Sequence, residues 1–307
     1  MTKIYENKEM RIPKYASLLS DAGFKAVLAS PRNKNVLKRL LNLVLPEDRR
    51  IIEIESYEDR EINGFTPFSK YARVDIRCRD IEGRSFIVEM QREMHKTFFE
   101  RCIWYASKSY EREVMPGEEY GSLKPVFIVA FLEERFEHEN ESLWNSEHCV
   151  SCYQMIEKRT GEFAPDTIMC IFVELGRFLK DGNELSDSFD KACFVFKNSE
   201  KWDNDAPAEV MDDALASELT QACEVANFPP DVKLNYVRDM FTEMDYHAEM
   251  NEAYRRGDIH GFANGRAEGI AETAVNLLAA GIPIATISSC TGLSAEEINK
   301  IASERNG

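Results

Sequence analysis

Two acidic residues occupy corresponding positions on two short segments whose patterns predict neighbouring strands. Residues 73–79 and residues 84–91 each alternate between apolar and polar side chains, and a Gly-containing turn near Glu82 joins them. This pattern is typical of a β-hairpin. With the turn centred near Glu82, Asp75 on the first strand lies directly opposite Glu89 on the second. The sequence therefore predicts two carboxylates side by side on one sheet.

Opposed carboxylates need a compensating positive charge. Cβ atoms of directly opposed strand residues are about 4.5–5.5 Å apart, and like charges at that distance destabilise the pair. A divalent cation supplies the compensation, and hard carboxylate oxygens suit Mg²⁺ or Mn²⁺. The alternative is that Asp75 and Glu89 are solvated strand residues paired with neighbouring arginines. A register shift of one residue would remove the opposition, since it turns one strand over.

The alternation also assigns an inner, apolar face to each strand of the hairpin. Its expected members are Val74, Ile76 and Cys78 on the first strand and Phe86, Val88 and Met90 on the second. Glu89 follows directly on an apolar run. We therefore expect its carboxylate to emerge where the strand leaves the core.

A basic helix face follows the hairpin. The segment from about residue 96 to residue 114 has helical periodicity, with Arg101, Tyr105, Lys108 and Arg112 on one face. A cationic stripe with one aromatic ring, next to paired acids, suits binding to nucleic-acid phosphates. The alternative is a solvated face whose basic residues pair with neighbouring acids on the same helix.

The surrounding segments predict the elements that hold these residues in place. A helix over residues 33–45 ends before Pro46, and a strand is expected over residues 49–56. Residues 124–132 form a near-continuous apolar run, the mark of a buried strand. Further strands are expected near residues 149–157 and 167–175. These elements predict an α/β fold with a mixed sheet flanked by helices.

Beyond about residue 200 the sequence changes to an Ala-, Glu- and Met-rich, all-α texture. Glycines fall at every fourth position, at Gly257, Gly261, Gly265 and Gly269. On a helix they form a smooth stripe suited to helix–helix contact, including contact between chains of a homo-oligomer, and a flexible connector is the alternative. Two short helices about the turn at residues 291–294 resemble a helix-turn-helix, with a capping box from Ser294 to Glu297. Packing or assembly is the favoured role of this end, and DNA reading the alternative.

Composition at first argues against a nucleic-acid partner. The chain carries 38 Lys and Arg against 54 Asp and Glu, a formal net charge of −16, whereas phosphate binding needs positive charge. The charge is unevenly distributed. Residues 1–115 carry 22 basic and 18 acidic side chains, a net of +4, and residues 116–307 carry 16 and 36, a net of −20. The acid pair and the basic helix face both lie in the slightly basic part, so the acidity does not exclude DNA.

Other features favour a cytoplasmic protein with no membrane partner. No run of apolar residues is long enough to cross a bilayer, and the charged first residues do not resemble a secretory signal. Eight Cys are scattered along the chain, which favours a reducing compartment. The single Cys149-x-x-Cys152 pair fits core thiols of a strand better than a zinc site.

A set of short motifs, in order along most of the chain, resembles the bacterial Rpn family of recombination-promoting nucleases and transposases, within the PD-(D/E)XK nuclease superfamily. The superfamily signature is a strand Asp and, on the returning strand, Glu-x-Lys; Asp75 and Glu89-Met90-Gln91 match it with Gln in place of Lys. The other matching motifs are Asp21…Phe24-Lys25, Leu40-Leu41-Asn42, Arg101…Trp104-Tyr105…Lys108, Pro125–Ala130, Val173-Glu174-Leu175 and the tail ending in Thr291-Gly292-Leu293-Ser294.

The resemblance implies a restriction-endonuclease-like domain over residues 1–200, followed by an α-helical region over residues 201–307. It implies Mg²⁺- or Mn²⁺-dependent hydrolysis of DNA phosphodiesters, with the cation held by Asp75, Glu89 and the backbone carbonyl of Met90. Gln91 takes the position of the Lys that orients or activates water, but an amide supplies no positive charge unless Arg101 or Lys108 substitutes. The alternative is a nuclease-fold protein that no longer cleaves and serves as a DNA-binding or assembly module. The resemblance assigns no role to Glu174.

Overall fold

A six-stranded mixed sheet organises the first of two units into which the chain divides, Met1–Met240 and Phe241–Gly307. The computed structural model describes residues 12–62, 72–113, 117, 119–145, 147–165 and 167–305. The strands, in the order in which they lie side by side, are β1 (Ile54–Tyr57), β4 (Ile76–Asp80), β5 (Ser85–Gln91), β6 (Val126–Leu132), β8 (Ile168–Glu174) and β7 (Val150–Tyr153). Neighbours β5, β6 and β8 run parallel, and the other pairs are antiparallel. A separate two-stranded ladder joins β2 (Glu61–Ile62) to β3 (Ala72–Arg73).

The parallel centre of the sheet is buried on both faces, as the apolar run over residues 124–132 predicts. Every residue of β6 is buried, because helices cover both sides of a parallel sheet. Its side chains alternate between two core clusters. Phe127, Val129 and Phe131 belong to one cluster, whereas Ile128 and Ala130 belong to the other.

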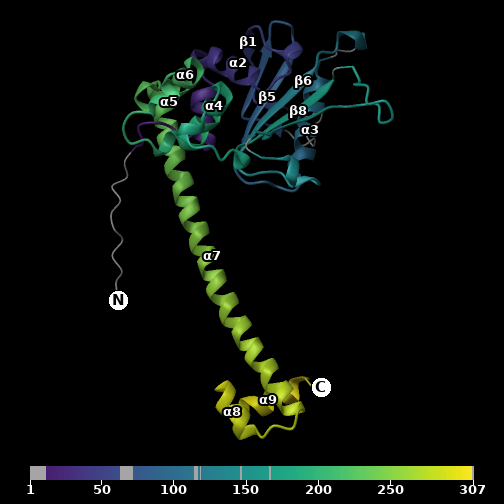
Figure 1. The fold of residues 1–307 in the computed structure, drawn as a ribbon, viewed down its shortest axis with the longest axis vertical. Coiled ribbons are helices and arrows are strands. Elements are labelled where there is room, and N and C mark those ends of the chain that lie inside the picture. Colours follow the sequence, from purple (N-terminus) through teal and green to yellow (C-terminus); the bar gives the residue numbers. More distant parts are fainter. Residues whose placement is uncertain are drawn as a thin grey trace. The chain divides into compact units, whose positions relative to one another are not determined.

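Helices divide between these two faces (Figure 1). The α-helices of the described chain are α1 (Asp21–Leu28), α2 (Lys34–Asn42), α3 (Phe98–Glu111), α4 (Ser188–Asn198), α5 (Ala208–Met211), α6 (Ala214–Cys223), α7 (Pro230–Ala279), α8 (Ile284–Thr291) and α9 (Ala295–Arg305). Apolar residues of α1, α2, α4 and α6 share one core cluster with the sheet, and those of α3 share the other. The fold is thus the predicted α/β arrangement, a mixed sheet between helices, with a mainly helical C-terminal region.

Helix α1 sits close to the preceding segment because its sequence allows it. Ser20 caps the helix, and its Oγ accepts a hydrogen bond from the backbone N–H of Gly23 at 3.0 Å. A Cβ on Gly23 would lie 1.9 Å from the backbone oxygen of Ser17, so only Gly fits there. On the opposite side of the helix Phe24 and Leu28 enter the core. This seating fixes the residues that α1 presents to the edge of the sheet.

Two predicted strands are shorter than expected. The strand predicted over residues 49–56 begins only at Ile54. The guanidinium of Arg84 donates hydrogen bonds to the carbonyls of Arg49 and Arg50, at 3.2 and 3.0 Å, which replaces a strand ladder at those positions. The strand predicted near residues 149–157 covers only Val150–Tyr153.

The first unit includes residues beyond 200, while the end of the nuclease-like domain at residue 200 stays a prediction. Helix α6 contributes Leu215 and Leu219 to the same core as α1 and α2. The unit therefore closes only with the first turns of α7, at Met240.

The second unit has a small core of its own. Ala274, Ile287 and Ile298 come from α7, α8 and α9 respectively and are buried together. The predicted turn and capping box are both present. Gly292 ends α8 with a positive φ of 75°, and the Ser294 N–H donates to Glu297 Oε2 while the Glu297 N–H donates to Ser294 Oγ.

The four-residue glycine stripe lies on α7. A Cβ added at any of its glycines would meet no atom within 4 Å in the described part of the chain. Contact through the stripe with a second chain stays a prediction. Among the described residues, no helix has the length and apolarity needed to span a membrane.

Candidate active site

The hairpin has the predicted register. Ile76 pairs with Val88 and Cys78 pairs with Phe86, so Asp75 comes opposite Glu89. The Asp75 backbone N–H donates to Glu89 Oε1 at 3.2 Å. The two acids are therefore adjacent, at the place where β4 begins and β5 approaches its end.

The first strand of the hairpin is interrupted, which the alternating pattern did not predict. β3 ends at Arg73 and β4 begins at Ile76. As a consequence Val74 does not share a face with Ile76; it packs with Ile87 in the core cluster on the α3 side. The expected face of Val74 was wrong, because the backbone turns between Arg73 and Ile76. This break also directs the Asp75 carboxylate across the hairpin, where Oδ2 accepts a hydrogen bond from the Met90 N–H at 2.9 Å.

Both carboxylates are withdrawn from water. Asp75 is 9% exposed and Glu89 is 6% exposed. Burial raises the pKa of Asp75. Burial also raises the pKa of Glu89 well above its ordinary value, and the neighbouring negative charge of Asp75 raises it further. Without a compensating cation, the ionised pair is unfavourable in this environment.

This environment predicts a pH dependence of stability for Glu89→Gln. The pKa of Glu89 is higher in the folded chain than in the unfolded chain, where it is about 4.3. Between those two values the folded protein holds a proton that the unfolded chain has lost. The stability of the wild type therefore falls as pH rises through this window, by about 1.4 kcal/mol for each pH unit that separates the folded pKa from the unfolded one. Gln does not titrate, so the variant gains stability relative to the wild type as pH rises above the unfolded-chain pKa of Glu89 toward its higher folded-chain pKa.

Chemical unfolding at a series of pH values, without divalent cations, measures this difference. The exposed Glu119 offers a matched control, since Glu119→Gln makes the same chemical change at a carboxylate that is not buried. If the curves of Glu89→Gln and wild type run parallel, Glu89 is not a buried acid of raised pKa.

A lysine that the sequence did not single out as a site residue lies against the pair. Lys25 of α1 places its Nζ 3.0 Å from Asp75 Oδ1 and 2.5 Å from Asp21 Oδ1. The i,i+4 spacing of Asp21 and Lys25 is a local signal for the second contact. The first contact joins residues far apart in the sequence, and no periodicity indicates it. Lys25 is the basic side chain that directly contacts the acid pair among the described residues.

Gln91 is held on both sides. Its Oε1 accepts a hydrogen bond from Arg101 Nη2, and its Nε2 donates to the Glu93 carbonyl at 2.6 Å. The Arg101 guanidinium lies 4.9 Å from the centre of the Phe98 ring, and its charge counteracts the rise in the pKa of Glu89. Arg101 thus brings positive charge to the position where the family pattern has Lys.

The predicted phosphate-binding face of α3 is divided by its packing. Tyr105 is buried in the core cluster under the helix. Lys108 lies over the Trp104 ring, with Nζ 5.2 Å from its centre, and Arg112 caps the end of α3 with an exposed side chain. Of the four predicted residues, Arg101 is the one whose charge acts on Glu89. Phosphate binding by this set stays a prediction.

The acid pair has the donor chemistry of a divalent-cation site. It offers two carboxylates and the nearby backbone carbonyl of Met90, all hard oxygen donors. Burial raises the pKa of both acids, so their ionised forms favour a nearby cation. In the described residues no group of three or more His, Cys, Asp or Glu side chains gathers at metal-binding distances. Two carboxylates and one carbonyl are the kind of donors that hold a cation with few protein ligands, as Mg²⁺ commonly is held.

Glu174 and the Cys149-x-x-Cys152 pair have structural environments. Glu174 is fully buried and its Oε atoms accept hydrogen bonds from the Phe136 N–H at 2.9 Å and Arg177 Nε at 2.6 Å, with His138 Nε2 at 2.8 Å. It therefore ties the segment after β6 to the end of β8. Cys149 and Cys152 are both free thiols; Cys149 is buried, whereas Cys152 is exposed, so the expectation of a core thiol was wrong for Cys152.

A mixed sheet with an acid pair on a hairpin between flanking helices defines an α/β nuclease-like protein. The comparison with known families agrees with this class: residues 18–253 match the model of the PD-(D/E)XK nuclease family transposases. Since the match covers most of the chain, the protein belongs to that family, to which the Rpn transposases correspond. No curated protein and no solved structure matches the chain.

Proposed function

We propose that the protein is a metal-dependent DNA endonuclease that hydrolyses phosphodiester bonds. The observation that carries the proposal is the pair Asp75 and Glu89, opposed on a hairpin and buried with raised pKa values, in a chain of a nuclease family. Structural ion pairs do not explain the arrangement, because two buried acids face a single ammonium group, that of Lys25, in the described part of the chain. A doubly charged cation compensates both.

The side chains of the site have distinct roles in this function. Asp75, Glu89 and the carbonyl of Met90 hold Mg²⁺ or Mn²⁺. When bound, the cation makes water a stronger nucleophile and offsets the negative charge that develops on the phosphate. Gln91 orients water through its amide, and Arg101 holds that amide in place. The basic residues of α3 bind DNA phosphates beside the site.

Lys25 adds a second positive charge to the site beside that of Arg101. Its ammonium group lies at Asp75 Oδ1, so it is held beside the carboxylates that would bind the cation. A fixed cation in a site with little water stabilises such charge strongly. Asp21 orients the ammonium from one turn earlier on α1.

Plasmid nicking with and without metal tests the function. We expect supercoiled DNA to be converted to the open circle in Mg²⁺ or Mn²⁺, and the conversion to stop when EDTA removes the cation, because the acid pair then lacks its charge compensation. Ca²⁺ is the control cation, since it binds oxygen ligands but tolerates irregular geometry. Nicking that continues in EDTA contradicts the proposed chemistry.

A non-cleaving DNA-binding or assembly module is the second candidate. Two observations favour it: Gln91 stands in place of Lys, and both of its polar groups are engaged within the protein. The same nicking assay separates the two functions. A protein that binds DNA but leaves plasmid intact in both Mg²⁺ and Mn²⁺ is the module rather than the enzyme.

A further inference from the structure

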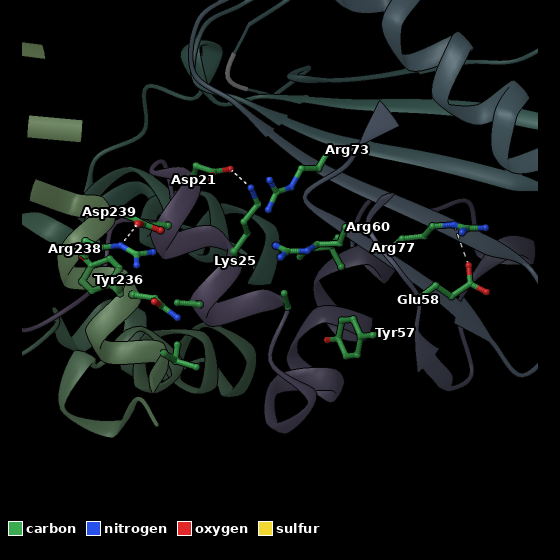
Figure 2. A pocket seen from close by; sticks show the side chains of 16 residues that line it. Asp21, Lys25, Tyr57, Glu58, Arg60, Arg73, Arg77, Tyr236, Arg238 and Asp239 are labelled. Carbon is green, nitrogen blue, oxygen red and sulfur yellow. Dashed lines mark hydrogen bonds and ion pairs between the residues drawn. The ribbon is translucent and has the colours of Figure 1, made fainter. Parts of the chain in front are cut away.

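An open cleft of about 630 Å³ lies beside α1 (Figure 2). One wall is α1, with Asp21 and Lys25, and another is the segment from β1 to β4. Residues near the start of α7, including Asn235 and Tyr236, complete the lining. Lys25 belongs both to this cleft and to the acid pair, because its Nζ contacts Asp75. The cleft therefore begins at the candidate active site.

Positive charge predominates in the cleft. Its lining includes five basic residues, namely Lys25, Arg60, Arg73, Arg77 and Arg238, and three acidic ones, namely Asp21, Glu58 and Asp239. This excess stands out in a chain whose net charge is −16. A cleft of this polarity attracts an anion.

Each acid of the cleft already has a basic partner. Asp21 pairs with Lys25, and Asp239 pairs with Arg238 at 3.2 Å. Glu58 lies 3.0 Å from Arg77 Nε, an ion pair without hydrogen-bond alignment, and accepts a hydrogen bond from the Arg79 guanidinium outside the cleft. Among the described residues of the lining, no acidic side chain is left to compensate a further cation.

Arg60 and Arg73 are the two basic residues of the described cleft lining that are not paired with one of its acids. Within the described ranges of the chain, neither guanidinium has an ion-pair or hydrogen-bond partner. Their backbones are held by the β2–β3 ladder, in which Arg73 pairs with Glu61 and the Val74 N–H donates to the Arg60 carbonyl at 3.0 Å. In Figure 2 the side chains of Arg60, Arg73 and Lys25 extend toward the same space. Like charges that converge on fixed backbones repel each other unless an anion lies between them.

We propose that this cleft binds the sugar–phosphate backbone of DNA, with Arg60 and Arg73 each contacting a phosphate next to the one at the acid pair. Guanidinium groups bind phosphate oxygens in a bidentate manner. Arg73 precedes Asp75 by two residues. A DNA strand bound at Arg73 therefore continues to the acid pair. The proposal rests on the proposed function for the identity of the anion as DNA. The excess positive charge of the cleft does not depend on the proposed function.

DNA binding in EDTA tests the cleft independently of cleavage. The probe is a short fluorescein-labelled duplex, and the full-length protein is titrated between about 50 and 200 mM salt. The variant Arg60→Gln/Arg73→Gln is expected to bind about 10- to 100-fold more weakly at the lowest salt and to reduce the slope of log K against log salt by roughly 2. Arg60→Lys/Arg73→Lys keeps the charges and is expected to retain most of that slope.

The matched control is Lys158→Gln/Arg159→Gln, which removes two exposed charges outside the cleft. Equal weakening by both double variants, or no weakening by the cleft variant, overturns the proposal, and so does a wild type that binds no duplex. A free anion as the natural occupant predicts another result: inorganic phosphate then displaces the duplex more effectively than chloride of equal ionic strength. That result also overturns the assignment to DNA.

The outcome is distinguishable from failure of the nuclease proposal. If the protein binds DNA through Arg60 and Arg73 but never nicks plasmid, the cleft proposal holds and the nuclease proposal fails. If the protein nicks plasmid equally well with and without both arginines, the nuclease proposal holds and the cleft proposal fails. Thermal unfolding of each variant confirms that the comparison is between folded proteins.

Discussion

Asp75→Asn is expected to reduce Mg²⁺-dependent nicking by about 10³-fold. The amide keeps the shape of the carboxylate, so its oxygen still accepts the hydrogen bond that the Met90 N–H donates to Asp75 Oδ2 at 2.9 Å. The negative charge is lost, however. The cation then has one carboxylate in place of two, and Lys25 loses one of its two carboxylate partners, the one at 3.0 Å. Single-turnover nicking at saturating Mg²⁺ measures the loss.

The matched control for this substitution lies on the same strand. Asp80 is fully buried at the other end of β4 and forms an ion pair with Arg84 at 2.7 Å. Asp80→Asn removes a buried charge of the same kind, which destabilises the fold, but it leaves the acid pair intact. We expect the folded fraction of this variant to nick at the wild-type rate. If Asp75→Asn nicks as fast as Asp80→Asn, the acid pair is not the catalytic site.

The register of the hairpin could be predicted because local chemistry determines it. Gly83 adopts a positive φ of 81°, which suits Gly in a tight turn. The alternation on either side then leaves one pairing that buries Cys78 against Phe86. From those two constraints the opposition of Asp75 and Glu89 follows. The family resemblance agreed with it independently, and the matched family model covers the same residues.

The remainder of the site could not be predicted, because it depends on contacts between distant segments. The break between Arg73 and Ile76 leaves no mark in a pattern that continues to alternate through it. The approach of Lys25 to Asp75 depends on how α1 seats on the sheet, and that depends on the close approach of Gly23 to the Ser17 carbonyl. Periodicity determines which face a residue takes, and packing determines what that face meets.

The basic face of α3 and the cleft are two further examples of what could not be predicted from the sequence. A helical wheel puts Tyr105 and Arg101 on one face, yet the ring is buried in the core while the guanidinium reaches Gln91. Conversely, Arg60 and Arg73 are distant in the sequence and become neighbours only through the β2–β3 ladder. Uncompensated charge is a property of the folded surface, so a tally of basic residues along the chain does not locate it.

Lys25→Met is expected to separate metal affinity from catalytic rate. In the wild type the Lys25 ammonium group lies next to Asp75 Oδ1, where it repels a bound metal ion. Its removal should tighten Mn²⁺ binding by about tenfold, a modest part of the Coulomb energy of two close cations at an effective dielectric constant of about 20. The same removal takes a fixed positive charge away from the reacting phosphate. The nicking rate at saturating Mn²⁺ should therefore fall by about 10²-fold.

This opposed change distinguishes a charge that acts on the reaction from one that only holds α1 against the sheet. A structural lysine predicts lower stability and an unchanged rate once metal saturates the folded protein. Lys34→Met on α2 is the matched control, because the Lys34 ammonium lies 3.9 Å from Glu53 and has no contact with the acid pair. Calorimetric Mn²⁺ titration gives the affinity and single-turnover nicking gives the rate. Lys25→Arg should restore part of the rate because it restores the charge, whereas a change in stability alone, with both constants at wild-type values, would assign Lys25 to the fold.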